Sequence, residues 1–252
     1  YSAAIDAGFS AASIINDAPI VMEDSSLEGI WRPENDSGRF LGPTRLRSAL
    51  TSSRNLVSIR LLQQLGVQRF IDYASRLGID TADFSADLSL ALGTQTMAPL
   101  EVAAAYATLA NGGYRVEPYL IQRIEDLAGN TVFEAEPATV CRDCEAGAEP
   151  RAGSSAELSM EEILRETTRP EAPRVMDERV HFIVDSMLMD VIKRGTGRKA
   201  LVLERGDIAG KTGTTNGPVD AWFSGYNPDV VTTTWVGFDD YQKLGRREFG
   251  GT

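Results

Sequence analysis

The C-terminal part of the chain restricts its fold most strongly. Three segments, DIAGKTGT, DAWFSGY and VVTTTWVGFDD, are rich in β-branched and aromatic residues, with an Asn227-Pro228-Asp229 turn between the last two. They predict three neighbouring antiparallel strands. Before them, apolar residues from Val180 to Ile192 recur at helical spacing, and Gly195 ends the pattern. Because helices and antiparallel strands occupy separate runs, the sequence predicts an α+β fold, an antiparallel sheet packed against helices.

The first half of the chain predicts short strands followed by helices. Turn residues at close intervals up to Pro43 indicate strands and turns. Thr44 is the expected start of a helix, and the hydroxyls of residues 51–53 predict a break near Ser52 to Asn55 because they compete with the helix backbone. The other expected elements are a second helix ending at Gly66, helices over 67–77 and 99–111, and a hairpin of 119–126 with 131–136.

Residues 137–174 differ in composition from the rest. They are rich in Glu, Ala, Pro and Ser, which predicts an inserted loop or a mobile excursion within a single domain spanning 1–252. Both cysteines, Cys141 and Cys144, lie there, either as a local disulfide or as two thiols. A zinc site needs four ligands and the only histidine is His181, so we expect no metal site and no cofactor.

The net charge limits the partners of the chain. It is -11 at pH 7, which repels polyanions, so we expect no nucleic-acid partner. No run of residues approaches the roughly 18 apolar residues of a membrane span.

Lys211 stands in a stretch that allows two interpretations. Gly210-Lys211-Thr212 ends like a phosphate-binding loop, which would make the chain a nucleotide hydrolase. However, the nearest glycine before it, Gly206, is one residue too close, and the residues after it are poor helix starters. The alternative is a carboxylate site on a strand. Lys211 and Gly213 would share one face, with Gly213 leaving room for a substrate backbone, while Thr212 and Thr214 would add hydroxyl donors.

Ser53-Arg54-Asn55 lies at the predicted break between two helices. A short loop there can aim a hydroxyl and an amide into one cleft. The simpler alternative makes Ser53 an N-cap, with Asn55 in the first helical turn.

The combination resembles a known family. LRSALTSSRNLVSIRLLQQLG, PLEVAAAYATLANGGY, GTGRKALVLERGDIAGKTGTTN and DAWFSGYNPDVVTTTWVGFDD, in that order, are similar to the transpeptidase domain of class A penicillin-binding proteins. The resemblance implies a serine β-lactamase-like fold and a D,D-transpeptidase that crosslinks peptidoglycan stem peptides ending in D-alanyl-D-alanine.

The resemblance also implies roles for single residues. Ser53 would relay a proton to the leaving amine, and Asn55 would hold the substrate peptide bond. Lys211 would supply positive potential near Ser53, and Thr212 and Thr214 would bind the terminal carboxylate, with the Thr214 N–H as an oxyanion donor.

One part of the family pattern does not occur. None of the four lysines has a serine three positions before it, so no Ser-x-x-Lys motif is present; Thr196 to Lys199, the nearest match, is assigned to a loop. We therefore expect a partial domain, truncated at both ends and inactive alone. The resemblance implies β-lactams as ligands, an N-terminal glycosyltransferase domain as partner, and a place on the periplasmic side of the bacterial inner membrane. A non-catalytic module that binds peptide ends remains the other alternative.

Overall fold

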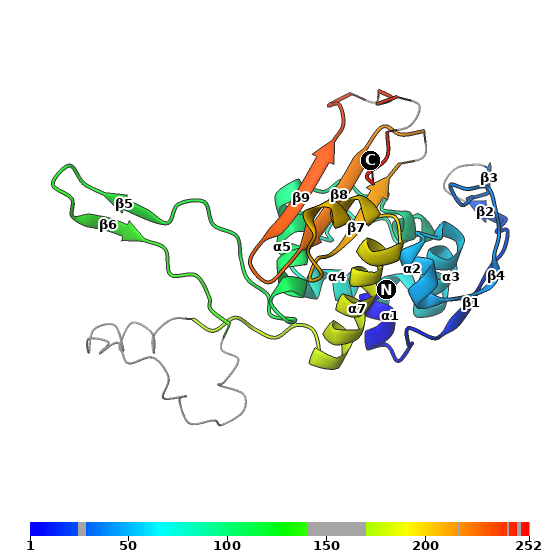
Figure 1. The fold of residues 1–252 in the computed structure, drawn as a ribbon, viewed down its shortest axis with the longest axis horizontal. Coiled ribbons are helices and arrows are strands. Elements are labelled where there is room, and N and C mark those ends of the chain that lie inside the picture. The colour runs from blue at the N-terminus through cyan, green and yellow to red at the C-terminus, as the bar shows by residue number, and fades with distance from the viewer. Residues whose placement is uncertain (25–28, 141–169, 216, 241, 246–247, 252) are drawn as a thin grey trace.

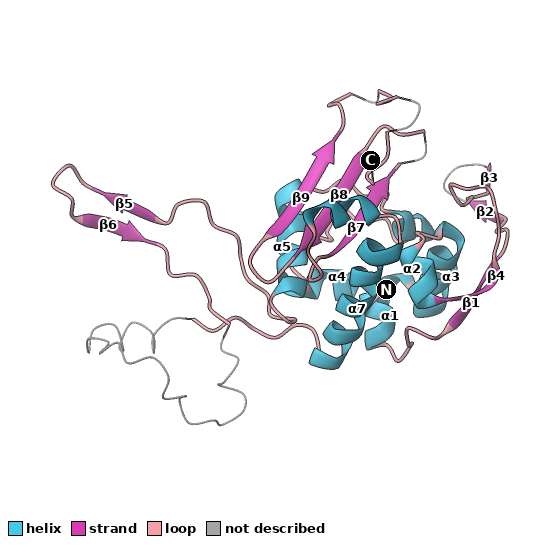
Figure 2. Ribbon diagram, in the orientation of Figure 1, coloured by secondary structure: helices cyan, strands magenta, loops and turns pink. Residues whose placement is uncertain are grey.

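The computed structural model describes the whole chain except residues 25–28, 141–169, 216, 241, 246–247 and 252. Helices gather around one face of a small sheet, and a long hairpin projects from this body (Figure 1; Figure 2). The predicted α+β class is confirmed. Among the described residues, no helix has both the length and the apolar character that crossing a bilayer would require.

The central sheet contains the three predicted C-terminal strands in the order β7-β8-β9. These are β7 (Ala209–Thr214), β8 (Ala221–Tyr226) and β9 (Val231–Val236), and both pairs are antiparallel. Because strand side chains alternate between faces, Ala209 and Lys211 share one face. Ala209 and its partner Tyr226 are buried in the main core, so this face is the one that meets the helices.

Two helices cover that face. α5 (Pro99–Ala110) contacts β8 and β9, and α7 (Glu178–Arg194) contacts β7. The Tyr226 ring packs edge-on against Tyr106 of α5 at 6.3 Å between centroids, and its hydroxyl donates to the Asp185 carboxylate of α7 at 2.8 Å. The predicted apolar stripe of α7 is buried, as expected; its buried members are Val180, Val184, Met187, Leu188, Val191 and Ile192.

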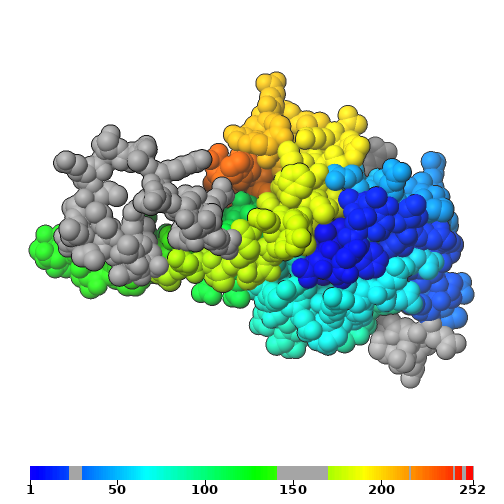
Figure 3. Space-filling view, turned by 90° about the horizontal axis from the view of Figure 1, so that it is seen from below, coloured from blue at the N-terminus to red at the C-terminus, as the bar shows by residue number. Residues whose placement is uncertain are grey.

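The N-terminal residues pack against this core. α1 (Ser2–Asp6) contacts α7, and the two segments lie side by side in Figure 3. β1 (Ile14–Asp17) pairs with β4 (Gly42–Arg45), and β2 (Met22–Asp24) pairs with β3 (Gly29–Trp31), both antiparallel. The short strands predicted for this region are therefore present.

One predicted helix start is wrong. Thr44 lies in β4 opposite Ile15, and its hydroxyl donates to the Gly42 carbonyl instead of capping a helix. The backbone pairing with β1 outweighs the local preference. α2 begins at Leu46 and ends at Thr51.

The remaining helices follow the sequence prediction closely. α3 (Asn55–Leu65) begins after the expected break and ends at Gly66, whose φ of 90° is tolerated because glycine has no Cβ. α4 (Val67–Arg76) follows directly. Among the described residues, the 3-10 helices η1 (Leu88–Leu92) and η3 (Arg198–Leu203) were not predicted, and η3 begins within the segment assigned to a loop.

The predicted hairpin is present but shorter than expected. β5 (Arg123–Glu125) pairs with β6 (Thr131–Glu134), with Ile124 opposite Phe133. It extends far from the sheet (Figure 1). Of the predicted insertion at 137–174, the central part and both cysteines lie outside the described residues; at its ends, Thr139 bridges to Glu171.

Candidate active site

The turn between α2 and α3 presents Ser53. After Thr51 the chain turns tightly, with the Ser53 N–H donating to the Leu50 carbonyl at 3.1 Å and the Arg54 N–H to the Ala49 carbonyl at 2.9 Å. Ser53 has a φ of 51°, in the left-handed region that a non-glycine residue seldom adopts. Strained residues of this kind persist only where the surrounding structure holds them in place, and they are frequent at functional sites.

Lys211 reaches this turn from the sheet. Its Nζ donates to Ser53 Oγ at 2.9 Å and to the Thr212 carbonyl at 2.7 Å. The predicted convergence of the two residues is therefore present. Burial lowers the pKa of the Lys211 ammonium to about 8, because the charged form loses hydration there. With this pKa the Lys211 side chain is mostly charged at pH 7 but loses its proton more easily than an exposed lysine.

The turn and the edge of β7 form the walls of a groove of about 360 Å³. Seven of the lining residues carry a hydroxyl and one an amide, together with the charged Asp36 and Arg54, which suits a polar ligand. The lining residues are Asp36, Ser37, Ser52, Ser53, Arg54, Asn55, Thr196, Thr212, Thr214, Thr215, Phe249 and Gly251.

The two threonines predicted to bind a carboxylate both line this groove. Thr212 Oγ1 lies 2.6 Å from Thr196 Oγ1, and Thr214 Oγ1 accepts a hydrogen bond from the Gly250 N–H at 3.0 Å. Thr196 lies in the loop after α7, and its own N–H donates to the Thr51 carbonyl at 3.2 Å. This loop thus links the end of α2 to β7.

Asn55 and Gly213, two other predicted site residues, each also have a structural contact. The Asn55 side-chain amide donates to the Glu34 carbonyl at 2.9 Å, so one of its N–H groups holds the neighbouring loop. A Cβ on Gly213 would lie 3.1 Å from the Cβ of Trp222 on β8. The missing side chain at 213 therefore makes room for the tryptophan next to it, rather than for a ligand alone.

The geometry rules out two of the alternatives raised by the sequence. Arg54, not Ser53, is the N-cap of α3, so the hydroxyl of Ser53 is not a helix cap. Lys211 lies within strand β7 and not at a helix N-terminus, so it is not part of a phosphate-binding loop. His181 Nε2 donates to the Leu109 carbonyl at 2.7 Å, which is a structural contact between α7 and α5.

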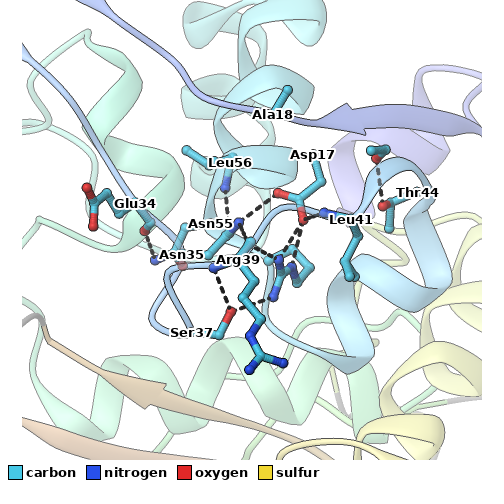
Figure 4. Close-up of polar contacts among 12 residues, drawn as sticks. Asp17, Ala18, Glu34, Asn35, Ser37, Arg39, Leu41, Thr44, Asn55 and Leu56 are labelled. Atoms are coloured by element: carbon cyan, nitrogen blue, oxygen red, sulfur yellow. Dashed lines mark hydrogen bonds and ion pairs between the residues drawn. The ribbon is translucent and has the colours of Figure 1, made fainter.

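Sequence patterns did not identify the residues that hold the turn from behind. Arg54 and Asp17 form an ion pair at 2.7 Å, and Asn35 donates to the same carboxylate; Figure 4 shows Asp17 and Asn35 facing each other within this network. These three side chains are buried, unlike most charged and amide groups. The sequence carried no signal that would have placed them together, since they lie on separate elements.

The sequence profile described as "Penicillin binding protein transpeptidase domain" matches residues 1–243. This chain belongs to that family. Penicillin-binding protein 1A of Pseudomonas aeruginosa is 49% identical over 269 residues, an alignment that covers 100% of this chain and 33% of the relative. Penicillin-binding protein 1A of Neisseria lactamica is 41% identical and is covered to 28%. The chain thus spans about a third of the length of these relatives.

Solved structures show the same fold. Penicillin-binding protein 1A of Haemophilus influenzae superposes with a TM-score of 0.86 at 35% identity, covering 100% of this chain and 38% of that one. PonA1 of Mycobacterium tuberculosis gives a TM-score of 0.74 at 22% identity over 99% of this chain and 62% of that protein, which shows the fold alone. The predicted penicillin-binding protein transpeptidase fold is confirmed, and the chain is a transpeptidase domain of the class A type.

Proposed function

We propose that this chain is the peptide-binding and proton-transfer part of a D,D-transpeptidase that crosslinks peptidoglycan stem peptides by serine acyl transfer. The observation that carries the proposal is the hydrogen bond from Lys211 Nζ to Ser53 Oγ at the wall of a groove lined by Thr212 and Thr214. The roles proposed for these residues follow from the family resemblance, and their meeting at one groove supports them.

The carboxylate end of a stem peptide would bind along β7. The Thr212 and Thr214 hydroxyls would donate hydrogen bonds to it, and the Lys211 ammonium would add positive charge nearby. Charge-assisted hydrogen bonds of this kind contribute roughly 1.5–3 kcal/mol each. The Asn55 carboxamide carries a second N–H besides the one on Glu34, and this group would hold the substrate peptide carbonyl.

Ser53 would transfer a proton between Lys211 and the leaving amine. Its hydroxyl can accept from the ammonium and donate at the same time, so it is suited to relay. With a pKa of about 8, Lys211 holds its proton at pH 7 but gives it up at a lower cost than an exposed lysine. In the tetrahedral intermediate, the Thr214 N–H would donate to the oxyanion.

None of the residues named above is proposed as the acylated serine. No Ser-x-x-Lys motif occurs in the 252 residues, and acyl transfer requires both a nucleophile and its base. We therefore expect that the chain by itself binds peptide ends and β-lactams without becoming acylated.

The comparisons support the partners of the complete protein. The relatives carry the name penicillin-binding protein 1A, and PonA1 has been solved with penicillin V, which supports β-lactams as ligands. Because the relatives are much longer, a second domain, expected to be a glycosyltransferase, is part of the proposal. Crosslinking takes place outside the cytoplasmic membrane, so the periplasmic side of the inner membrane is the proposed location.

Labelling with a fluorescent penicillin tests the proposal. A longer chain, extended upstream in the gene to include a Ser-x-x-Lys motif, should be labelled covalently, and labelling should be lost in its Lys211→Met variant. The 252-residue chain should show reversible binding alone. Covalent labelling of the 252-residue chain would refute the claim that it lacks the nucleophile. Reversible binding to the longer chain without acylation would instead favour the non-catalytic module that binds peptide ends.

A further inference from the structure

A buried ion pair lies directly behind the turn that carries Ser53. Arg54 Nε and an Nη of the same guanidinium donate to Asp17 Oδ2 at 2.9 and 2.7 Å. The Asp17 side chain is 0% exposed and the Arg54 side chain 9%. Arg54 stands between Ser53 and Asn55, so the position of its guanidinium fixes the backbone from which both of these side chains project.

The same network fixes a second wall of the groove. Asp17 also accepts from the Asn35 amide at 2.8 Å and from the Leu41 N–H at 3.0 Å. Arg54 donates to Ser37 Oγ at 3.0 Å and to the Arg39 carbonyl. Figure 4 shows Ser37, Arg39 and Leu41 arranged around Asp17 on a single loop. That loop includes Asp36 and Ser37, which line the groove.

Asn35 connects this loop to α3. Its side-chain oxygen Oδ1 accepts from the Leu56 N–H at 3.3 Å, in the first turn of the helix, while its side-chain Nδ2 donates to Asp17. The loop, the start of α3 and strand β1 are thus joined through three side chains. A buried network with its donors and acceptors satisfied is rigid, because each group that moves leaves another unpaired in a medium of low dielectric constant.

We propose that Arg54 and Asp17 are positioning residues for the transpeptidase reaction: their ion pair sets the distance from Ser53 to Lys211 and the width of the groove. This inference rests on the proposed function. Arg54 itself lines part of the groove, but neither residue touches the Lys211 ammonium in the described contacts, so both influence the Ser53 to Lys211 contact through the turn. Because a φ of 51° at Ser53 is strained, we expect the turn to relax to another conformation when the Arg54 guanidinium no longer holds it.

The fork of the guanidinium is the feature to test. Arg54→Lys keeps the charge, but a single ammonium cannot replace the two donors on Asp17 Oδ2 while also reaching Ser37 and the Arg39 carbonyl. A double variant, Asp17→Leu with Arg54→Met, removes both charges together and so leaves neither one buried alone. Ile59→Val is the control, because Ile59 is fully buried on α3 and its truncation costs stability without touching the groove.

Two measurements separate positioning from stability. The first is the affinity for an N-acylated D-alanyl-D-alanine peptide, followed by NMR titration of the 252-residue chain. The second is the titration midpoint of the Lys211 side chain, followed by NMR with isotope-labelled lysine; this is practical because the chain has four lysines. Thermal unfolding of each variant shows which of them are folded at the temperature of measurement.

We expect Arg54→Lys and the double variant to bind the peptide on the order of tenfold more weakly, since small displacements of reacting groups are costly. The Lys211 midpoint should rise towards that of an ordinary lysine, while Ile59→Val leaves both quantities unchanged. If peptide binding and the midpoint match those of the control, the positioning role is wrong and the proposed function stands. If the parent chain binds no peptide, the proposed function fails, and the Lys211 midpoint alone decides the positioning role.

Discussion

Lys211 Nζ and Ser53 Oγ are 2.9 Å apart although 158 residues separate them in sequence. The contact joins the edge strand of the sheet to a turn between two helices, so neither element alone defines the site. It also places an ammonium in a region that removes part of its hydration. The loss of hydration disfavours the charged form of Lys211, although its contact with Ser53 uses that form.

Lys211→Met should stabilise the domain and abolish peptide binding. Burial lowers the pKa of Lys211 to about 8 from 10.5, so the unfolded chain holds the proton more tightly than the folded one. Removing the charge should therefore raise the free energy of unfolding at pH 7 by about 1–3 kcal/mol. Urea unfolding of both proteins measures the difference.

The pH dependence of that difference provides its check. Between pH 8 and pH 10.5 the unfolded state binds more protons than the folded state, so the parent should gain stability relative to Lys211→Met as the pH rises. This gain in stability ends near pH 10.5, the ordinary pKa of a lysine. A difference that stays constant across this range would contradict the lowered pKa of Lys211.

Ser53→Gly should be more stable than Ser53→Ala by about 1 kcal/mol. Both variants lose the hydroxyl that accepts from Lys211, but only glycine adopts a φ of 51° without steric cost. Chemical denaturation of the two variants gives the comparison. Equal stability would mean that the left-handed conformation at Ser53 carries no strain.

Thr196→Val should weaken peptide binding by about fivefold to tenfold, whereas Thr196→Ser should leave it nearly unchanged. The Thr196 hydroxyl lies 2.6 Å from that of Thr212; when it donates to Thr212, the proton of Thr212 is left for the ligand carboxylate. Loss of one such hydrogen bond typically costs about 1 kcal/mol. Peptide titration of the two variants tests whether Thr196 acts through Thr212.

Gly195→Ala should destabilise the domain by roughly 1–3 kcal/mol. A Cβ at this position would overlap the Thr51 carbonyl, a backbone atom at the end of α2 that cannot move aside easily. Gly206→Ala is the matched control, because its Cβ would meet nothing within 4 Å. Similar melting temperatures for the two variants would show that the contact between the end of α7 and α2 is dispensable.

Local patterns predicted most of the fold. The period of the apolar residues identified α7, and β-branched runs separated by turn residues identified β7, β8 and β9. They were less reliable where a tertiary contact decides the conformation. Thr44 has the local chemistry of a helix start, but its backbone pairs with Ile15 across 29 residues of sequence, and no local pattern reports that pairing.

The site was predicted in part for the same reason. Ser53, Lys211, Thr212 and Thr214 stand in short motifs, and the structure brings them to one groove. Asp17, Asn35 and Thr196 support that groove from three distant segments. Their residue types are ordinary for turns and loops, so only the folded chain reveals that Asp17 meets a guanidinium or that Thr196 meets a second hydroxyl.

The packing of α1 against α7 has a consequence for synthesis on the ribosome. Ala3, Ala4 and Ile5 are buried in the core, yet their partner helix spans Glu178–Arg194. α3 and α4 also contact α1 and are made early, but α7 follows roughly 175 residues later, so at about 5–20 residues per second the side of α1 that meets α7 would stay uncovered for roughly 9–35 s. During that interval these apolar side chains are natural sites for a chaperone, and the domain completes its core late in translation.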